Sequence, residues 1–215
     1  MNAQRIPNLS RLAYANGILG ALAVILIFIF FAVGEPFGTL NDITGLLWGL
    51  TLAPLMYVFY QRAVPRTPNV TIAFGAGLIG CAAFIALQLL LVLRVLTFEQ
   101  QYGPLTLTYG LIGVWMILVS RAARRAGELA RGLAWFGIAI GAMWALTSVL
   151  TWLGGPIPSD MSALADPSKI NPFLLVSFIS FFFAYIAQPI WALWLGRVFK
   201  HPTARTASVS AVTGE

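Results

Sequence analysis

The chain has 215 residues, of which 59% are hydrophobic and only 9% are charged, and its mean hydropathy is +0.85. Soluble domains carry about 25% charged residues, because a water-facing surface must be solvated. This composition excludes a soluble globular protein and indicates a chain whose solvent is lipid. The formal net charge of +6 does not indicate nucleic-acid binding, because the basic residues flank apolar segments and form no separate basic module.

The length limits the architecture to one membrane domain. A helix needs roughly 20 apolar residues to cross a bilayer. Stretches without charge, each bounded by Pro, Gly or a charge cluster, predict six such helices. We expect an all-α, polytopic transmembrane six-helix bundle over residues 1–200, followed by a short flexible cytoplasmic tail over 201–215. The spans are expected at about 12–33, 43–60, 70–93, 105–120, 132–153 and 173–196.

The first span follows Arg5, a basic residue that could also begin a signal peptide. However, Leu12–Val33 contains 22 residues, more than the roughly 7–15 of a cleavable apolar region. The following Gly34-Glu35-Pro36 does not match a small-x-small cleavage site. We therefore expect a retained first span.

The third and fourth spans each carry one further prediction. The third contains Cys81, the single cysteine of the chain, which excludes an intramolecular disulfide and is expected to be a small packing residue. The fourth is the shortest, and we expect it to gain a turn at Arg121. Its helix could continue through Arg124, Arg125 and Glu128, where the spacing permits weak ion pairing.

The longest connection, Gly154–Asn171, leads to the sixth span. Asn171 is a good helix cap and Pro172 a good first helical residue, so the sixth helix should begin there. Within this span Pro189 removes an amide donor and frees a carbonyl about one turn earlier. Gln188 directly precedes it, and we predict that these two residues mark a break in the sixth helix that faces the bundle interior, because lipid can satisfy neither a freed carbonyl nor a carboxamide.

The distribution of Lys and Arg predicts the orientation. Eleven lie on one side of the predicted spans: Arg5, Arg11, Arg62, Arg66, Arg121, Arg124, Arg125, Arg131, Arg197, Lys200 and Arg205. The other side holds only Arg94 and Lys169. Basic residues near helix ends favour the cytoplasmic side. We therefore predict a multi-pass protein of the bacterial inner (plasma) membrane with both termini in the cytoplasm.

Small residues recur at a spacing of four, a pattern that lets helix backbones approach closely in lipid. We interpret these positions as internal packing seams, with a dimer face as the alternative for one of them. The seams are Ala13-Gly17-Ala21, Gly45-Gly49, Ala73-Gly77-Cys81 and Gly137-Gly141.

The spacing of matching residues suggests three repeated helical hairpins. Gly17 and Gly77 are 60 residues apart, while Arg62 and Arg121, which follow the second and fourth spans, are 59 apart. By the same alignment, Met56, Trp115 and Trp191 each stand six residues before a terminal arginine. The alternative is chance similarity among helices rich in Gly, Ala and Trp.

Polar side chains inside a bilayer are costly and are therefore candidates for function. The candidate polar site within the membrane comprises Gln188, Gln88 and Tyr185. Gln188 could line a cavity and bind a ligand, or it could satisfy the carbonyl freed near Tyr185. Weaker candidates are hydroxyl residues of the fifth span, because helical Ser and Thr can bond to their own backbone. These are Thr147, Ser148 and Thr151.

A second candidate cluster lies at the outer face. Arg94 is the only arginine on that side, and several carboxylates share the side with it. The cluster could order the loops through ion pairs or form one wall of a polar pocket, and we expect Arg94 to pair with Glu99 or Asp42. The carboxylates considered are Glu35, Asp42, Glu99 and Asp160.

No residue pattern predicts a catalytic site, a metal site or a cofactor. His201, the only histidine, is in the C-terminal tail, which excludes paired-histidine haem ligation and Ser-His catalysis within the membrane. Neither Lys169 nor Lys200 is predicted to lie mid-membrane, which excludes a retinal-type Schiff base.

The segment Pro189–Arg197 resembles the end of an uncharacterised family of bacterial six-span integral membrane proteins of similar length. The resemblance implies a six-span fold and carries no activity with it.

Three hypotheses about function follow. The favoured one is a non-enzymatic membrane protein that is an accessory or interaction subunit, or that binds lipid or a small apolar ligand. The first alternative is a small oligomeric transporter or channel, although the spans contain no ionisable residue able to relay protons or hold a coupling ion. The second is a membrane enzyme acting on lipid at the outer face. Expected partners are the lipid bilayer, other membrane proteins or further copies of the chain, and no nucleic acid.

Overall fold

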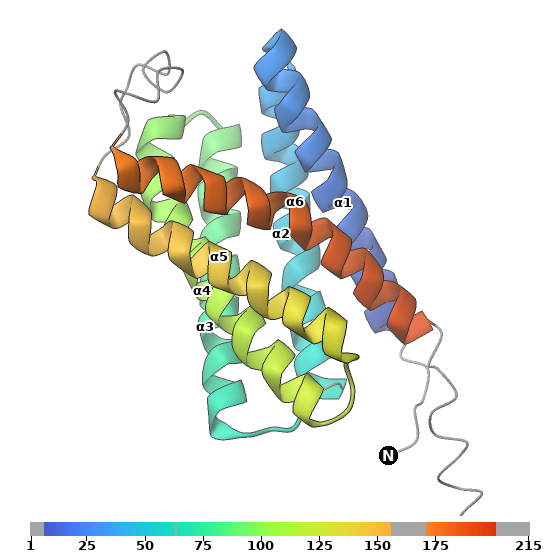
Figure 1. Cartoon of the computed structure of the whole chain (residues 1–215). Coiled ribbons are helices and arrows are strands. Elements are labelled where there is room, and N and C mark those ends of the chain that lie inside the picture. The colour runs from blue at the N-terminus through green and yellow to red at the C-terminus, as the bar shows by residue number, and fades with distance from the viewer. Residues whose placement is uncertain (1–6, 63, 156–170, 201–215) are drawn as a thin grey trace, which may run out of the picture.

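The computed structural model describes residues 7–62, 64–155 and 171–200 (Figure 1). This part of the chain contains no strand and forms six α-helices: α1 (Pro7–Val33), α2 (Phe37–Arg62), α3 (Pro68–Val92), α4 (Phe98–Arg125), α5 (Arg131–Gly154) and α6 (Pro172–Lys200). All six are long and apolar enough to cross a membrane. The prediction of an all-α polytopic six-helix bundle is confirmed. The predicted tail over 201–215 and most of the connection before α6 lie outside the described residues.

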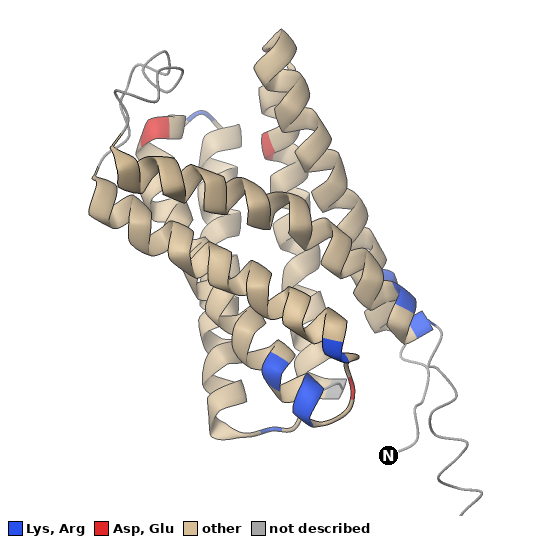
Figure 2. Ribbon diagram, in the orientation of Figure 1, with Lys and Arg blue, Asp and Glu red and all other residues tan. Residues whose placement is uncertain are grey.

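Charged residues of the described helices gather at the two ends of the bundle (Figure 2). We call one the basic end, where α2, α4 and α6 terminate and where Arg121, Arg124, Arg131, Arg197 and Lys200 lie. We call the other the opposite end, which carries Glu35, Asp42, Arg94 and Glu99. The middle of each helix is thus free of formal charge, as a bilayer requires.

Helices α2 and α4 begin six and seven residues before the predicted spans, because local caps stabilise their first turns. The Glu35 carboxylate accepts hydrogen bonds from the backbone N–H of Thr39 at 3.3 Å and from its hydroxyl at 3.1 Å. Thr97 and Gln100 form a capping box at the start of α4, each side chain accepting from the other's backbone N–H. Glycine, proline and carboxylate residues near these starts had suggested loops.

The other predicted helix ends are close to the observed ones. Helix α4 continues to Arg125 as expected, but Glu128 lies beyond it. Gly127, at φ 77°, takes the left-handed position that ends the helix. The predicted cap of α6 is confirmed, because the Asn171 side-chain oxygen accepts a hydrogen bond from the Phe173 N–H at 2.9 Å.

The six helices form a closed ring. Each helix packs against its neighbours in the chain, and α6 also packs against α1. In Figure 1, α6 runs from the upper left to the lower right, and its later part lies beside α1. The hairpins α1–α2, α3–α4 and α5–α6 therefore follow one another around a common axis, which all six helices enclose.

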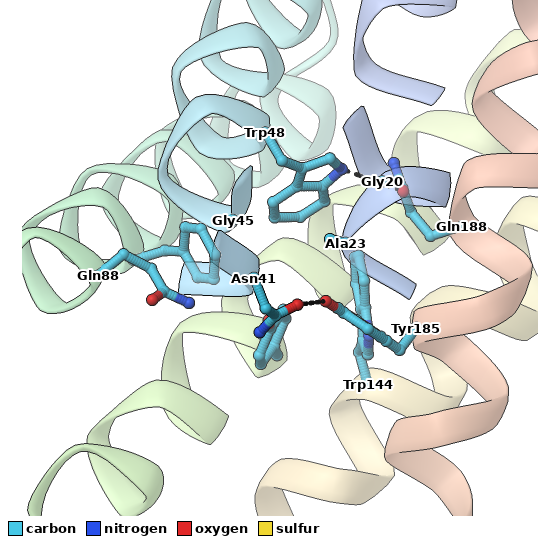
Figure 3. A pocket seen from close by; sticks show the side chains of 11 residues that line it. Gly20, Ala23, Asn41, Gly45, Trp48, Gln88, Trp144, Tyr185 and Gln188 are labelled. Carbon is cyan, nitrogen blue, oxygen red and sulfur yellow. Dashed lines mark hydrogen bonds between the residues drawn. The ribbon is translucent and has the colours of Figure 1, made fainter. Parts of the chain in front are cut away.

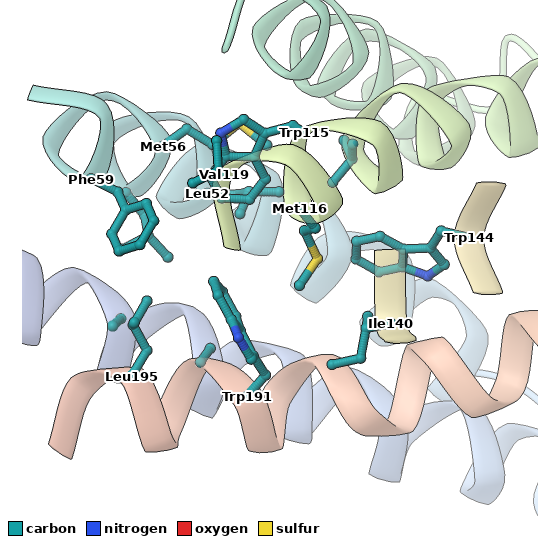
Figure 4. Packing of buried hydrophobic residues seen from close by; sticks show 14 of the residues in the cluster. Leu52, Met56, Phe59, Trp115, Met116, Val119, Ile140, Trp144, Trp191 and Leu195 are labelled. Atoms are coloured by element: carbon teal, nitrogen blue, oxygen red, sulfur yellow. The ribbon is translucent and has the colours of Figure 1, made fainter. Parts of the chain in front are cut away.

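The ring axis is filled by large apolar side chains in the half nearer the basic end (Figure 4). Trp115 and Met116 of α4 meet Trp191 of α6 and Met56 of α2 there, and each is at most 2% exposed. We call these four residues the apolar plug. All four residues belong to one buried cluster, packed as protein interiors are.

The outward faces of the ring are apolar as well. Ile18, Ile79, Val149 and Ile179 are each more than half exposed, on four different helices. A protein that is apolar both inside and outside cannot be solvated by water, so these faces are the lipid-contacting surface.

The predicted small-residue seams lie between helices of the ring. A Cβ atom added to Gly17 would lie 2.7 Å from Leu193 Cγ, and one added to Gly77 would lie 2.7 Å from Trp115 Cβ. Gly137 would meet Trp191 Nε1 at the same distance. The second and third hairpins thus share a Gly–Trp contact through the two tryptophans that the alignment pairs, whereas the first hairpin packs its glycine on Leu193 of α6. The threefold repeat remains a prediction.

Candidate functional site

A partly enclosed cavity lies on the ring axis, between the apolar plug and the opposite end (Figure 3). Side chains or backbone of all six helices line it, and none of the lining residues carries a formal charge. They are Gly20 and Ala23 of α1, Asn41, Gly45 and Trp48 of α2, Phe84 and Gln88 of α3, Tyr109 of α4, Trp144 of α5, and Tyr185 and Gln188 of α6. The cavity measures about 370 Å³ together with its opening. Its enclosed part has room for about one or two water molecules.

Buried carboxamides connect three helices along one side of the cavity. The Gln188 Oε1 atom accepts a hydrogen bond from Trp48 Nε1 at 3.1 Å, and Gln188 Nε2 donates to Asn16 Oδ1 at 2.8 Å. Asn16 in turn donates to the Trp48 backbone oxygen at 3.0 Å and to the Thr51 hydroxyl at 3.1 Å. We call Asn16, Trp48 and Gln188 the carboxamide network. Its members tie α1, α2 and α6 together inside the bundle.

A second hydrogen bond crosses the ring nearer the opposite end. The Tyr185 hydroxyl of α6 donates to Asn41 Oδ1 of α2 at 3.1 Å. The dashed line in Figure 3 shows this bond beside the cavity. Because α2 and α6 are not neighbours in the chain, the bond links two walls of the cavity that belong to different hairpins.

Gln88 of α3 differs from these paired groups. Its side chain is 7% exposed, and its Oε1 atom is buried without a hydrogen-bond partner among the described residues. No dashed line reaches it in Figure 3. Trp144, which also lines the cavity, has an unpartnered Nε1 atom within the same described ranges. Two of the lining side chains therefore retain unused hydrogen-bonding capacity.

Aromatic rings form the remaining walls. The ring centroids of Trp48 and Phe84 are 5.2 Å apart in an edge-to-face arrangement, and those of Phe84 and Tyr109 are 5.5 Å apart. Tyr109 and Trp144 follow at 5.2 Å. These four rings contact one another in series and give the cavity a rigid apolar surface.

Hydroxyl residues of α5 lie away from the cavity and join α5 to α6. Thr151 and Ser177 share a hydrogen bond of 2.7 Å, and the Ser177 hydroxyl donates to the Thr147 backbone oxygen at 3.1 Å. Thr147 and Thr151 thus bond across a helix interface. Sequence reasoning had offered bonding to their own backbone as sufficient explanation.

All three residues of the predicted membrane site line this one cavity. Gln188 and Tyr185 come from α6 and Gln88 comes from α3. The expected partnership between Gln188 and the backbone near Tyr185 is not found, because Gln188 bonds to Trp48 and Asn16 instead. The predicted break in the sixth helix is wrong, because α6 continues through Pro189 as one helix, whereas Gln188 is buried and faces the interior as predicted.

Sequence reasoning missed the partners of these residues. Asn16 is a carboxamide near the start of the first charge-free stretch, four residues after Leu12, and is fully buried. The rule that polar groups inside a bilayer are functional candidates applies to it directly and would have found it. This rule does not select Asn41, because Asn41 lies outside the predicted second span. It does not select Tyr109 either, because aromatic residues are common throughout the chain.

The predicted outer-face cluster is divided in the structure. Asp42 lies near Glu35, at the α1–α2 turn. Arg94 is exposed in the α3–α4 connection and Glu99 is exposed in the first turn of α4, and within the described residues Arg94 forms no ion pair with Glu99 or Asp42. Asp160 lies outside the described residues. The expected pairing of Arg94 is therefore not supported.

The position of Arg94 has a local explanation. At φ 57°, it occupies the left-handed position that ends α3, and the following N–H of Val95 bonds to the Leu90 oxygen at 2.9 Å. The helix C-terminus carries a partial negative charge that favours a cation. Arg94 thus ends a helix, the role that Gly127 has at the end of α4.

The cavity offers neutral donors and acceptors beside aromatic surface. Amide, indole and phenol groups bind and orient a molecule, whereas bond cleavage requires an activated nucleophile or an acid–base pair. The fold and the cavity together define a polytopic membrane protein whose helices enclose a small uncharged polar site. No family model, curated protein or solved structure matches the chain. The resemblance at Pro189–Arg197 therefore remains a prediction.

Proposed function

We propose that the protein binds a small, uncharged, mainly apolar molecule in the cavity on the ring axis. The observation that supports this most is the lining itself, which draws aromatic and neutral polar side chains from all six helices. Ligand sites are typically concave and mostly apolar, with a few polar groups that orient the ligand.

The lining restricts the ligand in charge and size. An ion in a site without a counter-charge would lose its hydration without compensation, so an uncharged molecule is favoured. The enclosed space favours a molecule with few non-hydrogen atoms, unless the helices separate on binding. Four such atoms gain at most about 6 kcal/mol, which corresponds to a dissociation constant no lower than about 40 µM.

Acetone and acetate, which have nearly the same shape and differ in charge, test this proposal. In saturation-transfer NMR of the purified protein in detergent, acetone should show contact with the protein and acetate should not. Gly45→Val should remove most of the acetone signal, because a Cβ at this position already lies 3.3 Å from Gln88 Nε2 and the added methyl groups enter the cavity.

Gly75→Val is the matched control for this experiment. No heavy atom lies within 4 Å of a Cβ built on Gly75, so this variant adds the same volume away from the cavity. An acetone signal that survives Gly45→Val as well as it survives Gly75→Val would show that the solute binds elsewhere, and the proposed function would then be wrong.

We also propose that both termini face the cytoplasm of a bacterial inner membrane, so that the cavity lies in the outer half of the bilayer. In a Cys81→Ala background, an impermeant thiol reagent added to intact cells should label Glu99→Cys at the opposite end. It should not label Ser208→Cys until the cells are permeabilised. Labelling of Ser208→Cys in intact cells would reverse the orientation and place the cavity nearer the cytoplasm.

Transport of the same class of molecule is the second candidate function. It is favoured by the position of the cavity on the axis of a closed ring. A transporter must open the apolar plug at Trp115 and Trp191, whereas a binding protein keeps it closed. Uptake of radiolabelled acetone-sized solutes by proteoliposomes separates these two functions.

A further inference from the structure

The Gln88 carboxamide lies where a bound molecule would contact it. It projects from α3 toward Gly45 of α2, and the missing side chain of Gly45 leaves its amide group uncovered on that side (Figure 3). Phe84 stands one turn earlier on α3, with the Trp48 ring against it. A molecule in this space would therefore meet one amide group and two aromatic rings.

The other carboxamides around the cavity are already paired. Gln188 uses both ends of its amide, and Asn41 Oδ1 accepts from Tyr185. A buried polar atom without a partner destabilises the folded state. Gln88 therefore contributes nothing to stability through its amide in this state, unlike Gln188, and its hydrogen-bonding groups are free for a ligand.

We infer that the ligand carries a neutral group that both donates and accepts hydrogen bonds, as a primary amide or an alcohol does, and that this group pairs with Gln88. The remainder of the ligand is apolar and packs on Phe84 and Trp48. This inference rests on the proposed function and specifies the chemical class of its ligand.

The chemistry of the carboxamide excludes a purely apolar ligand such as a hydrocarbon chain. Such a molecule would cover the amide and leave both its oxygen and its nitrogen unpaired in a site that water can no longer reach. A group with both a donor and an acceptor satisfies the carboxamide whichever way the amide is turned. A group that only accepts would satisfy the nitrogen alone.

Acetamide and acetone test the inference, because they are similar in size and differ in the donor. In competition saturation-transfer NMR, the wild-type protein should bind acetamide more tightly than acetone by on the order of fivefold, the effect of one additional hydrogen bond. Gln88→Leu should abolish this preference and retain acetone binding. Gln88→Met, with a side chain of similar length, should do the same.

Gln101→Leu is the matched control. Gln101 is a fully buried glutamine whose two amide atoms lack partners among the described residues, but it does not line the cavity. This variant should keep the acetamide preference. The melting temperature of the ligand-free Gln88→Leu protein should not fall. An unchanged melting temperature would show that Gln88 acts in binding and not in folding.

Each other outcome contradicts a different statement. Equal binding of acetamide and acetone, with both lost in Gly45→Val, would overturn the pairing with Gln88 and leave the proposed function intact. A preference that disappears in Gln101→Leu as much as in Gln88→Leu would also overturn the pairing. Absence of binding for both solutes would contradict the proposed function itself.

Discussion

Gly141→Ala should destabilise the bundle by about 1–3 kcal/mol or more, measured as a loss of thermal stability in detergent. Helices α4 and α5 are in backbone contact here, since a Cβ on Gly141 would lie 2.5 Å from the Gly113 oxygen and 3.1 Å from the Ile117 nitrogen. Backbone atoms cannot rotate away as a side chain can. The helices must therefore separate, and the packing on both sides of the seam is lost.

Gly75→Ala is the matched control, because it also replaces a helical glycine by alanine. Its added Cβ would meet no heavy atom within 4 Å, and alanine favours a helix by up to about 1 kcal/mol over glycine. This variant should be as stable as the wild type or slightly more so. Equal effects of the two substitutions would mean that helix propensity, and not the contact with Gly113, determines the result.

Gln188→Leu should cost on the order of 2 kcal/mol, because it leaves two buried groups without partners. Trp48 Nε1 loses its acceptor and Asn16 Oδ1 loses its donor. Leucine is more compatible with lipid than glutamine, so a gain in stability would show that the carboxamide network is not a structural tie. Chemical or thermal unfolding in detergent measures the change.

Two further variants sharpen this test. Gln101→Leu removes a buried glutamine that has no partner in the described part of the chain, so it should be neutral or stabilising. Combining Gln188→Leu with Asn16→Leu should cost less than the sum of the two single changes, because both remove the same hydrogen bond. Strict additivity would contradict direct coupling between the first and last helices.

The number and positions of the helices could be predicted because charge-free length is a local property of the chain. The starts of α2 and α4 could not, since the predicted loops there are capped by side chains of Glu35 and Thr97. Charged and polar residues near a span end therefore mark a cap as often as a loop. The closed ring is a global property, and no spacing in the sequence indicates that α6 packs against α1.

The site shows the same limit. Gln88, Gln188 and Tyr185 could be selected as single residues because polar groups inside a bilayer are costly. The hydrogen bonds of Gln188 and Tyr185 could not be predicted, because their partners Asn16 and Asn41 are distant from them in the chain. The expected ion pair of Arg94 also depended on contacts that the sequence does not give, because residues on the same side of a membrane need not be neighbours.

The contact between α1 and α6 also determines when the cavity can exist during biosynthesis. The chain enters the membrane from its N-terminus, so Asn16 is inserted while Gln188 is still unsynthesised. Until α6 is inserted, the amide of Asn16 can bond only to α2, and one side of the cavity is open. The cavity can therefore close only after α6 has been synthesised, and a ribosome-bound chain that ends before Gln188 has α1 to α5 but lacks the complete α6 wall of the cavity.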